Sequence, residues 1–259
     1  MWPVAMALAA TASVLSGARA APQEVVAMFY FDPVYFIFAL PALALVMYAQ
    51  YKVKSTYAKY AQVGSLAGAT GAQVGRRLLD QAGLGFINIE RIPGELTDHY
   101  DPKAKVLRLS DGVYANASVA ALGIVAHECG HALQDKAGYA PLRVRAGLVP
   151  AANIGSNAGY WIFLLGFFIH LPAIAWLGVG LFSLATLFTL VTLPVEFNAS
   201  NRALQLLRQN SFLTPVELKG AESVLSAAAL TYVAALAQSL ATLLYFVFRL
   251  TGMSSRDER

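Results

Sequence analysis

The chain has 259 residues, of which 57% are hydrophobic and only 13% are charged, where an ordinary soluble protein carries roughly 25% charged residues. This composition excludes a typical soluble enzyme and predicts a membrane protein. The net charge of +4 comes without a basic motif interleaved with aromatic residues, so no nucleic-acid partner is expected. The single cysteine, Cys129, excludes an intrachain disulfide.

Residues 1–27 are expected to be a signal-like or dispensable extension. An apolar run of about a dozen residues is followed by the small residues Ala18 and Ala20, as at a secretory cleavage site, but no basic residue precedes it. Two interpretations stay open at this point. The segment is either a cleaved signal peptide, or it is dispensable because the mature chain starts at Met28.

The segment 28–50 is predicted to be the first transmembrane helix. It has the length that a bilayer core requires, and its aromatic residues gather at the outer end, as in an interfacial belt. Lys52, Lys54 and Lys59 follow immediately. By the positive-inside rule these lysines place the next part of the chain in the cytoplasm and the N-terminus outside.

Residues 51–146 are the only long stretch with the chemistry of a soluble protein, and twelve of the nineteen Lys and Arg residues lie within it. Thr70 and Gln73 form the pattern of a capping box at the start of an amphipathic helix, GAQVGRRLLDQAG. Gly83 occupies the position where such a helix stops. This region is therefore expected to begin with a capped helix.

Two strand-like runs follow, at 86–92 and 105–110, with the polar stretch ELTDHY between them. Asn116 or Ser118 can then cap a helix that continues to Lys136. We expect residues 51–146 to form a small cytoplasmic α+β unit.

The fifty residues 146–195 contain no charged side chain. As one helix they would extend for about 75 Å, whereas a bilayer core is about 30 Å thick, so the segment must fold back. The sequence His170-Leu171-Pro172 is the expected turn of a transmembrane hairpin, which returns Glu196 to the side that the chain left. The remaining expected segments are the hairpin itself at 147–193, a polar helix at 194–221, a fourth span at 222–250 and a tail at 251–259.

The stretch GIVAHECGHALQD lies on the helix that ends at Lys136. His127 and His131 are two of only four histidines in the chain, and an H-E-x-x-H pattern would arise by chance only about 0.002 times in such a sequence. Positions i and i+4 of a helix lie one turn apart, with Cβ atoms about 6 Å apart, so both imidazoles can bind one zinc ion at about 2.1 Å. Glu128 can then act as general base for the attacking water.

A catalytic zinc ion usually keeps three protein ligands, so a third ligand is required. The extended pattern with a third downstream histidine is absent, because Ala137 stands at that position. His170 is expected at the far end of the hairpin, and His99 precedes the helix. Glu196 fits best, because the hairpin returns it to the same surface and a carboxylate at the edge of an apolar span is costly unless it is bound.

Several long blocks of sequence now resemble a known family. The blocks GELTDHYDPKAKVLRLS, VAHECGHALQ, GYAPLRVRAGLVPAANIGS, VTLPVEFNASNRALQLL and AAALTYVAAL occur in this order and are similar to the YugP-type membrane zinc metallopeptidases of prokaryotes. The resemblance implies a bacterial integral membrane metallopeptidase with His127, His131 and Glu196 as ligands of one Zn²⁺ and Glu128 as catalyst. Residues 1–27 have no counterpart in it, which favours Met28 as the start of the mature chain.

A looser resemblance extends to the HtpX-type and CAAX prenyl proteases, which carry a glutamate ligand in an E-x-x-x-D pattern after a membrane hairpin. Ser200 stands here where that aspartate would be. The resemblance therefore leaves three neighbours as candidates for orienting the ligands, namely Asn198, Ser200 and Arg202.

Three further residues are candidates for contacts with the substrate or with the oxyanion of the tetrahedral intermediate. His99 and Tyr100 lie in the strand-like region before the histidine helix, where an edge strand could hold a substrate backbone. A polar hairpin without a role in binding is an equally good interpretation. Tyr232, in the last expected span, is the third candidate, although interfacial tyrosines are common. Cys129 is expected to be a small buried hydrophobe rather than a redox residue.

Together these patterns predict a mainly α membrane protein with about four transmembrane helices and a small α+β, zincin-like catalytic unit. The expected activity is a zinc-dependent endopeptidase of the bacterial inner membrane, cutting membrane-associated or apolar protein substrates. The alternative is a membrane scaffold or chaperone with a structural zinc ion. A solute transporter is disfavoured, because beyond Asp32 the spans lack charges. The substrate, and whether the protein works as a homo-oligomer or with a membrane regulator, are left open.

Overall fold

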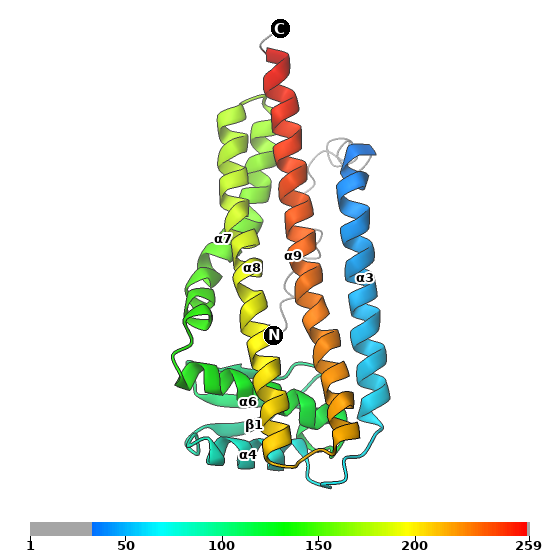
Figure 1. Ribbon diagram of the computed structural model, residues 1–259. Coiled ribbons are helices and arrows are strands. Elements are labelled where there is room, and N and C mark those ends of the chain that lie inside the picture. Colours follow the sequence, from blue (N-terminus) through cyan, green and yellow to red (C-terminus); the bar gives the residue numbers. More distant parts are fainter. Residues whose placement is uncertain (1–32, 258–259) are drawn as a thin grey trace. The chain divides into compact units, whose positions relative to one another are not determined.

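The structure is a computed structural model that describes residues 33–257, and within them the chain is mostly helical (Figure 1). The predicted extension 1–27, the first residues of the segment 28–50 and the last two residues of the tail lie outside the described residues. The described chain divides into two compact units. The first contains residues 49–143 and 193–231, and the second contains residues 33–48, 144–192 and 232–257.

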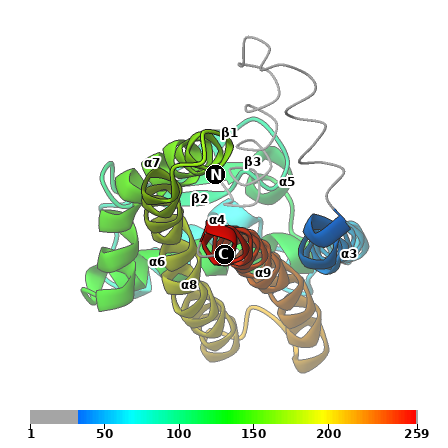
Figure 2. The same cartoon turned by 90° about the horizontal axis from the view of Figure 1, so that it is seen from above.

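The first unit contains a three-stranded mixed sheet. Its strands are β1 (Asn88–Ile92), β2 (His99–Asp101) and β3 (Val106–Ser110), in the spatial order β1-β3-β2, which the strand labels of Figure 2 follow. β3 pairs parallel to β1 and antiparallel to β2. Strand β3 is the most buried, as its central position and its apolar sequence require. Strand β2 is left at one edge.

Helix α4 (Gly71–Gln81) has the capping box that the sequence predicts. The Thr70 side chain accepts a hydrogen bond from the Gln73 amide, and the Gln73 side chain accepts one from the Thr70 amide. The helix stops before Gly83, whose φ of 65° belongs to the left-handed region that favours glycine. The predicted helix and its stop are therefore confirmed.

Helix α6 (Val119–Lys136) is the central element of this unit and follows the single turn α5 (Asp111–Tyr114). Ser118, one of the two expected caps, accepts a hydrogen bond from the amide of Ala121. Nearly every side chain of α6 is buried, and Figure 1 shows α6 beside α4, which it contacts. A helix that is apolar all round needs such an enclosure, and the polar residues within it must therefore find partners inside the protein.

Three long helices supply the rest of the first unit: α3 (Pro33–Ala61), α8 (Pro172–Gln209) and α9 (Pro215–Asp257). Side chains from all three enter the same apolar core as α6. The segment 194–221, expected as one helix, divides between the end of α8 and the start of α9, with a turn at 210–214. Within this unit α8 also passes very close to α6, because a Cβ added at Gly130 would lie 2.6 Å from the Ala199 carbonyl oxygen.

The second unit contains most of helix α7 (Ala140–Phe168), which is followed by a short turn and α8. The turn falls at His170 and Leu171, where the sequence places it. The two helices approach closely through glycines: a Cβ at Gly178 would lie 2.3 Å from the backbone nitrogen of Phe163. Small residues at such crossings are typical of helix packing in membranes. An aromatic core completes the unit, with the rings of Phe163 and Phe246 stacked 3.8 Å apart.

Among the described residues, three helices are long and apolar enough to cross a membrane, namely α3, α8 and the part of α9 from Pro215 to Gly252. The expectation of four spans is wrong in this respect, because α7 does not qualify. Asn153, Ser156 and Asn157 lie in the middle of α7 and lower its apolar character. An uncharged sequence is therefore not sufficient for a span. The chain is nevertheless a mainly α protein with a small sheet and helices suited to a membrane.

Candidate metal centre

The two histidines of α6 and one glutamate of α8 converge inside the first unit. The Nε2 atom of His127 lies 3.2 Å from Oε2 of Glu196, and the Nε2 atom of His131 lies 3.6 Å from the same oxygen. The His127 and Glu196 side chains are buried, and 12% of the His131 side chain is exposed. The structure thus brings Glu196 to the two histidines that the sequence singled out, which precede it by 69 and 65 positions.

These three side chains have the chemistry and the spacing of a zinc site. One ligand atom from each lies within 4.8 Å of the other two. Two ligands that are each about 2.1 Å from a tetrahedral zinc ion are about 3.4 Å apart, so the two nitrogen–oxygen distances match what zinc requires. Two imidazoles and one carboxylate suit zinc better than Ca²⁺ or Mg²⁺, which prefer oxygen ligands. The residues present therefore fit a zinc ion.

The opposite nitrogen of each imidazole has a polar partner. Nδ1 of His127 lies 3.2 Å from Oγ of Ser200, and Nδ1 of His131 lies 2.9 Å from Oε1 of Gln134. With Nδ1 occupied in this way, the Nε2 atoms of both rings are turned toward Glu196. Ser200, proposed from sequence to orient a ligand, is thus in contact with His127.

Asn198 and Arg202 lie one contact further from the histidines. Oδ1 of Asn198 accepts hydrogen bonds from Nε2 of Gln134 at 3.0 Å and from Nε of Arg202 at 2.8 Å. Asn198 therefore contacts Gln134, the partner of His131, and Arg202 contacts Asn198. Sequence reasoning missed Gln134, although positions 127, 131 and 134 lie on one face of a helix at the spacing i, i+4, i+7. The position of a glutamine on the histidine face of an apolar helix was the feature that could have identified Gln134 as a partner of the histidines.

Glu128 lies next to the three residues, on the same helix, and is 4% exposed. Its Oε2 atom accepts a hydrogen bond from the backbone amide of Tyr100 on edge strand β2, at 3.0 Å. Burial, with help from the nearby charges of Asp98 and Glu196, raises the pKa of Glu128 to about 7, against the lowering effect of His127 and of the Tyr100 amide. A carboxyl group poised near neutral pH can both accept and release a proton.

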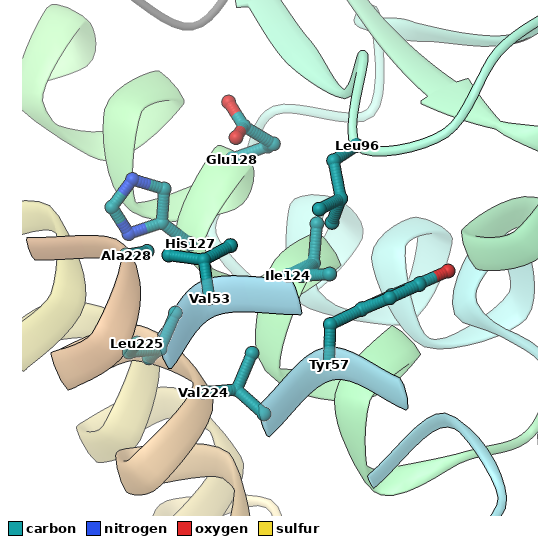
Figure 3. A pocket seen from close by; sticks show the side chains of 9 residues that line it. All are labelled: Val53, Tyr57, Leu96, Ile124, His127, Glu128, Val224, Leu225 and Ala228. Atoms are coloured by element: carbon teal, nitrogen blue, oxygen red, sulfur yellow. The ribbon is translucent and has the colours of Figure 1, made fainter. Parts of the chain in front are cut away.

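A narrow, mainly apolar pocket opens beside Glu128 and His127. Figure 3 shows the His127 imidazole and the Glu128 carboxylate with aliphatic side chains from several elements around the cavity. The remaining lining residues are Val53 and Tyr57 of α3, Leu96, Ile124 of α6, and Val224, Leu225 and Ala228 of α9. All of them belong to the first unit. The surroundings of the carboxylate on this side are therefore mainly apolar.

The side chains of His99 and Tyr100 have partners of their own. His99 Nδ1 lies 2.9 Å from the Thr97 carbonyl oxygen, and the Tyr100 hydroxyl donates to Oδ2 of Asp135 at 2.7 Å. Of these two residues, the structure brings only the backbone of Tyr100 to Glu128. Tyr232 is buried in α9 and is the first residue of that helix in the second unit.

Cys129 is buried in α6, and its thiol lies 3.9 Å from the carbonyl oxygen of Gly75. Burial and the charge of Glu128 raise the pKa of this thiol, so that it stays protonated. The residue therefore has the environment of a small hydrophobe, as expected.

Comparison with known proteins points to zinc metallopeptidases. The family described as "Putative neutral zinc metallopeptidase" matches residues 35–251. The "Putative membrane protease YugP" of Bacillus subtilis (strain 168) is 46% identical over 224 residues, which cover 86% of this chain and 99% of that protein. No solved structure matches. With a match over most of its length, from within α3 to within α9, the chain belongs to this family of zinc metallopeptidases.

Proposed function

We propose that this protein is a membrane-embedded zinc endopeptidase in which His127, His131 and Glu196 hold one zinc ion. The observation that carries the proposal is the convergence of two imidazole Nε2 atoms on one buried carboxylate oxygen, at 3.2 and 3.6 Å. A second carboxylate, Glu128, lies beside these three residues but is not one of the candidate ligands. A purely structural zinc site would have no use for such a free carboxylate.

When bound, zinc would polarise the scissile carbonyl and make water a better nucleophile at neutral pH. Glu128 acts as the general base that takes a proton from the attacking water and delivers it to the leaving amine. The backbone amide of Tyr100 holds the Glu128 carboxylate in place by a hydrogen bond. Burial favours the protonated, neutral carboxyl group that forms once Glu128 has accepted the proton.

The substrate class follows from the pocket beside Glu128. Its aliphatic lining favours an apolar side chain next to the bond that is cut, because a charged group would lose its hydration there. Helices suited to a membrane border the same site within the first unit, through α3, α8 and α9. Membrane proteins and apolar segments of other proteins are therefore the proposed substrates.

The decisive experiment is Glu128→Gln in the full-length protein, purified in detergent with zinc. The variant should bind about one zinc ion, like the wild type, and should cut neither an unstructured soluble protein nor a single-span membrane protein. Glu222→Gln is the matched control, because Glu222 is an exposed carboxylate of α9 in the same unit. It should leave cleavage unchanged.

Two outcomes would contradict the proposal. Equal cleavage by Glu128→Gln and wild type would remove Glu128 from catalysis. A wild type that binds zinc and cuts neither substrate would favour the alternative, a scaffold or chaperone with a structural zinc ion. Faster cleavage of the soluble substrate than of the membrane protein would overturn only the substrate class.

The proposed location is the bacterial inner membrane, with the first unit in the cytoplasm. The exposed lysines at the end of α3, Lys52, Lys54 and Lys59, support this orientation by the positive-inside rule. Lys103→Cys places a thiol in an exposed turn of this unit, while Cys129 is buried. A membrane-impermeant thiol reagent should label this variant in inverted vesicles and not in intact cells. The reverse pattern would place the site outside.

A further inference from the structure

Gln134 takes no part in the proposed mechanism, yet it is fully buried, and both of its N–H donors and its carbonyl oxygen have hydrogen-bond partners. Oε1 lies 2.9 Å from Nδ1 of His131, while Nε2 donates to the carbonyl oxygen of Val195 at 2.8 Å and to Oδ1 of Asn198 at 3.0 Å. These contacts join the histidine helix α6 to α8 at the residue immediately before Glu196. The amide therefore touches both parts of the candidate metal centre.

The donor and acceptor roles in this hydrogen-bond network are fixed at both ends. A backbone carbonyl can only accept a hydrogen bond, so the NH₂ group of Gln134 must face Val195. A guanidinium can only donate, so Arg202 requires the oxygen of Asn198 on its side, and that oxygen again faces the NH₂ group of Gln134. The Gln134 oxygen is thereby left facing His131. It can only accept, so the proton of a neutral His131 must lie on Nδ1.

We propose that Gln134 is a positioning residue that fixes His131 in the tautomer with a free lone pair on Nε2, directed at Glu196. The proposal rests on the zinc site proposed above and deepens it. The network also couples the tautomer to the position of α8, because the Val195 carbonyl moves with the backbone that carries Glu196. A neutral imidazole whose second nitrogen donates to a fixed acceptor is a better oriented and more basic ligand.

His127 provides an internal comparison. Its Nδ1 atom faces the hydroxyl of Ser200, which can donate as well as accept. Ser200 therefore does not impose a tautomer, and the two histidines of the same motif are controlled differently. Loss of Gln134 should change the proton position on His131 and leave His127 as it was.

The test uses the full-length metal-free protein in detergent, with ¹⁵N-labelled histidine and at a pH where neutral imidazole predominates. The chain has only four histidines, and the His131 signals are assigned by their loss in His131→Asn. In the wild type, His131 should show a protonated Nδ1 and an unprotonated Nε2. In Gln134→Leu a signal from protonated Nε2 should appear, and zinc affinity, measured by competition with a chelator, should fall about 10- to 100-fold.

Three further variants separate this role from a merely structural one. Gln134→Glu keeps an acceptor for His131 and should keep the proton on Nδ1, whereas Gln134→Met should behave like Gln134→Leu and fills the same space if the leucine variant fails to fold. Gln81→Leu, an exposed glutamine of the same unit, is the matched control and should change neither readout.

The proposal is overturned if His131 keeps its proton on Nδ1 in both apolar variants, or if their zinc affinity stays within about twofold of the wild type. A failure of the zinc site itself has a different signature. In that case the wild type would not bind zinc, while the tautomer of His131 in the metal-free protein would still depend on Gln134.

Discussion

Gly130 lies inside the histidine motif, and its lack of a side chain sets the distance between α6 and α8. A Cβ at this position would lie 2.6 Å from the Ala199 carbonyl oxygen and 3.3 Å from the Ala199 Cα. Ordinary contacts begin at 3.4 Å, so Gly130→Ala must push the two backbones apart by about 0.8 Å. The atom that must give way is backbone, three residues after Glu196, rather than the end of a flexible side chain.

Gly130→Ala should change the free energy of unfolding only modestly but should lower the zinc affinity strongly. Alanine is favoured over glycine in a helix by about 1 kcal/mol, whereas overpacking a core costs about 1–3 kcal/mol. Gly130→Ala should therefore lower the free energy of unfolding by at most about 2 kcal/mol and leave a folded protein. A metal site, however, tolerates displacements of only about 0.5 Å, so zinc affinity should fall about tenfold or more.

Gly123→Ala is the matched control on the same helix. A Cβ at Gly123 would lie 3.3 Å from the Cβ of Ala221, a contact that a small shift relieves, and at ordinary van der Waals distances from the Ala221 backbone, 3.5 Å from its Cα and 3.8 Å from its carbonyl oxygen. Zinc competition with a chelator and thermal unfolding of both variants in detergent are the measurements. If Gly130→Ala binds zinc as tightly as Gly123→Ala does, the close approach of α6 and α8 does not control the site.

Three other predictions concern single side chains. Glu196→Gln should weaken zinc binding at least as strongly as the loss of an outer contact, about 10- to 100-fold in a chelator competition, and unchanged affinity would remove Glu196 from the ligand set. Tyr100→Phe should leave the rate of substrate cleavage nearly unchanged, because the hydroxyl is bound to Asp135 while only the amide contacts Glu128; a large loss of rate would restore the hydroxyl to catalysis. Burial raises the pKa of Asp98 in the folded protein, despite its hydrogen bonds from Ser110. The folded state therefore binds the Asp98 proton more tightly than the unfolded state does, which adds to the free energy of unfolding at low pH. This contribution is lost as the pH rises from the ordinary pKa of an aspartate through the raised pKa. Asp98→Asn can keep both hydrogen bonds but does not titrate, so it should remove that loss. Denaturant unfolding across this pH range should then show a free energy of unfolding that depends less on pH than in the wild type.

The local features of this fold could be predicted from the sequence because each depends on neighbours in the chain. The capping box of α4 needs only Thr70 and Gln73, three residues apart, and the pair His127 and His131 needs only the helical repeat of α6. The return of Glu196 was also predictable, since fifty uncharged residues must fold back in a bilayer. The spans were predicted less well, because an uncharged stretch such as α7 can still carry too many polar residues.

Other features depend on contacts between residues far apart in the sequence, and only the tertiary structure decided them. Nothing near Tyr100 indicates that its amide contacts Glu128, because this contact requires the edge position of β2 beside α6. Judged from the neighbouring sequence alone, Gln134 is one more polar residue near a helix end. Its proposed role depends on α8, which places the Val195 carbonyl, an acceptor, against Gln134 and places Glu196 against His131. The candidate zinc-binding side chains could be predicted from the sequence, because ligand chemistry belongs to single side chains. The packing of α6 against α8 decided how those atoms are oriented, because a hydrogen-bond direction is fixed by both partners.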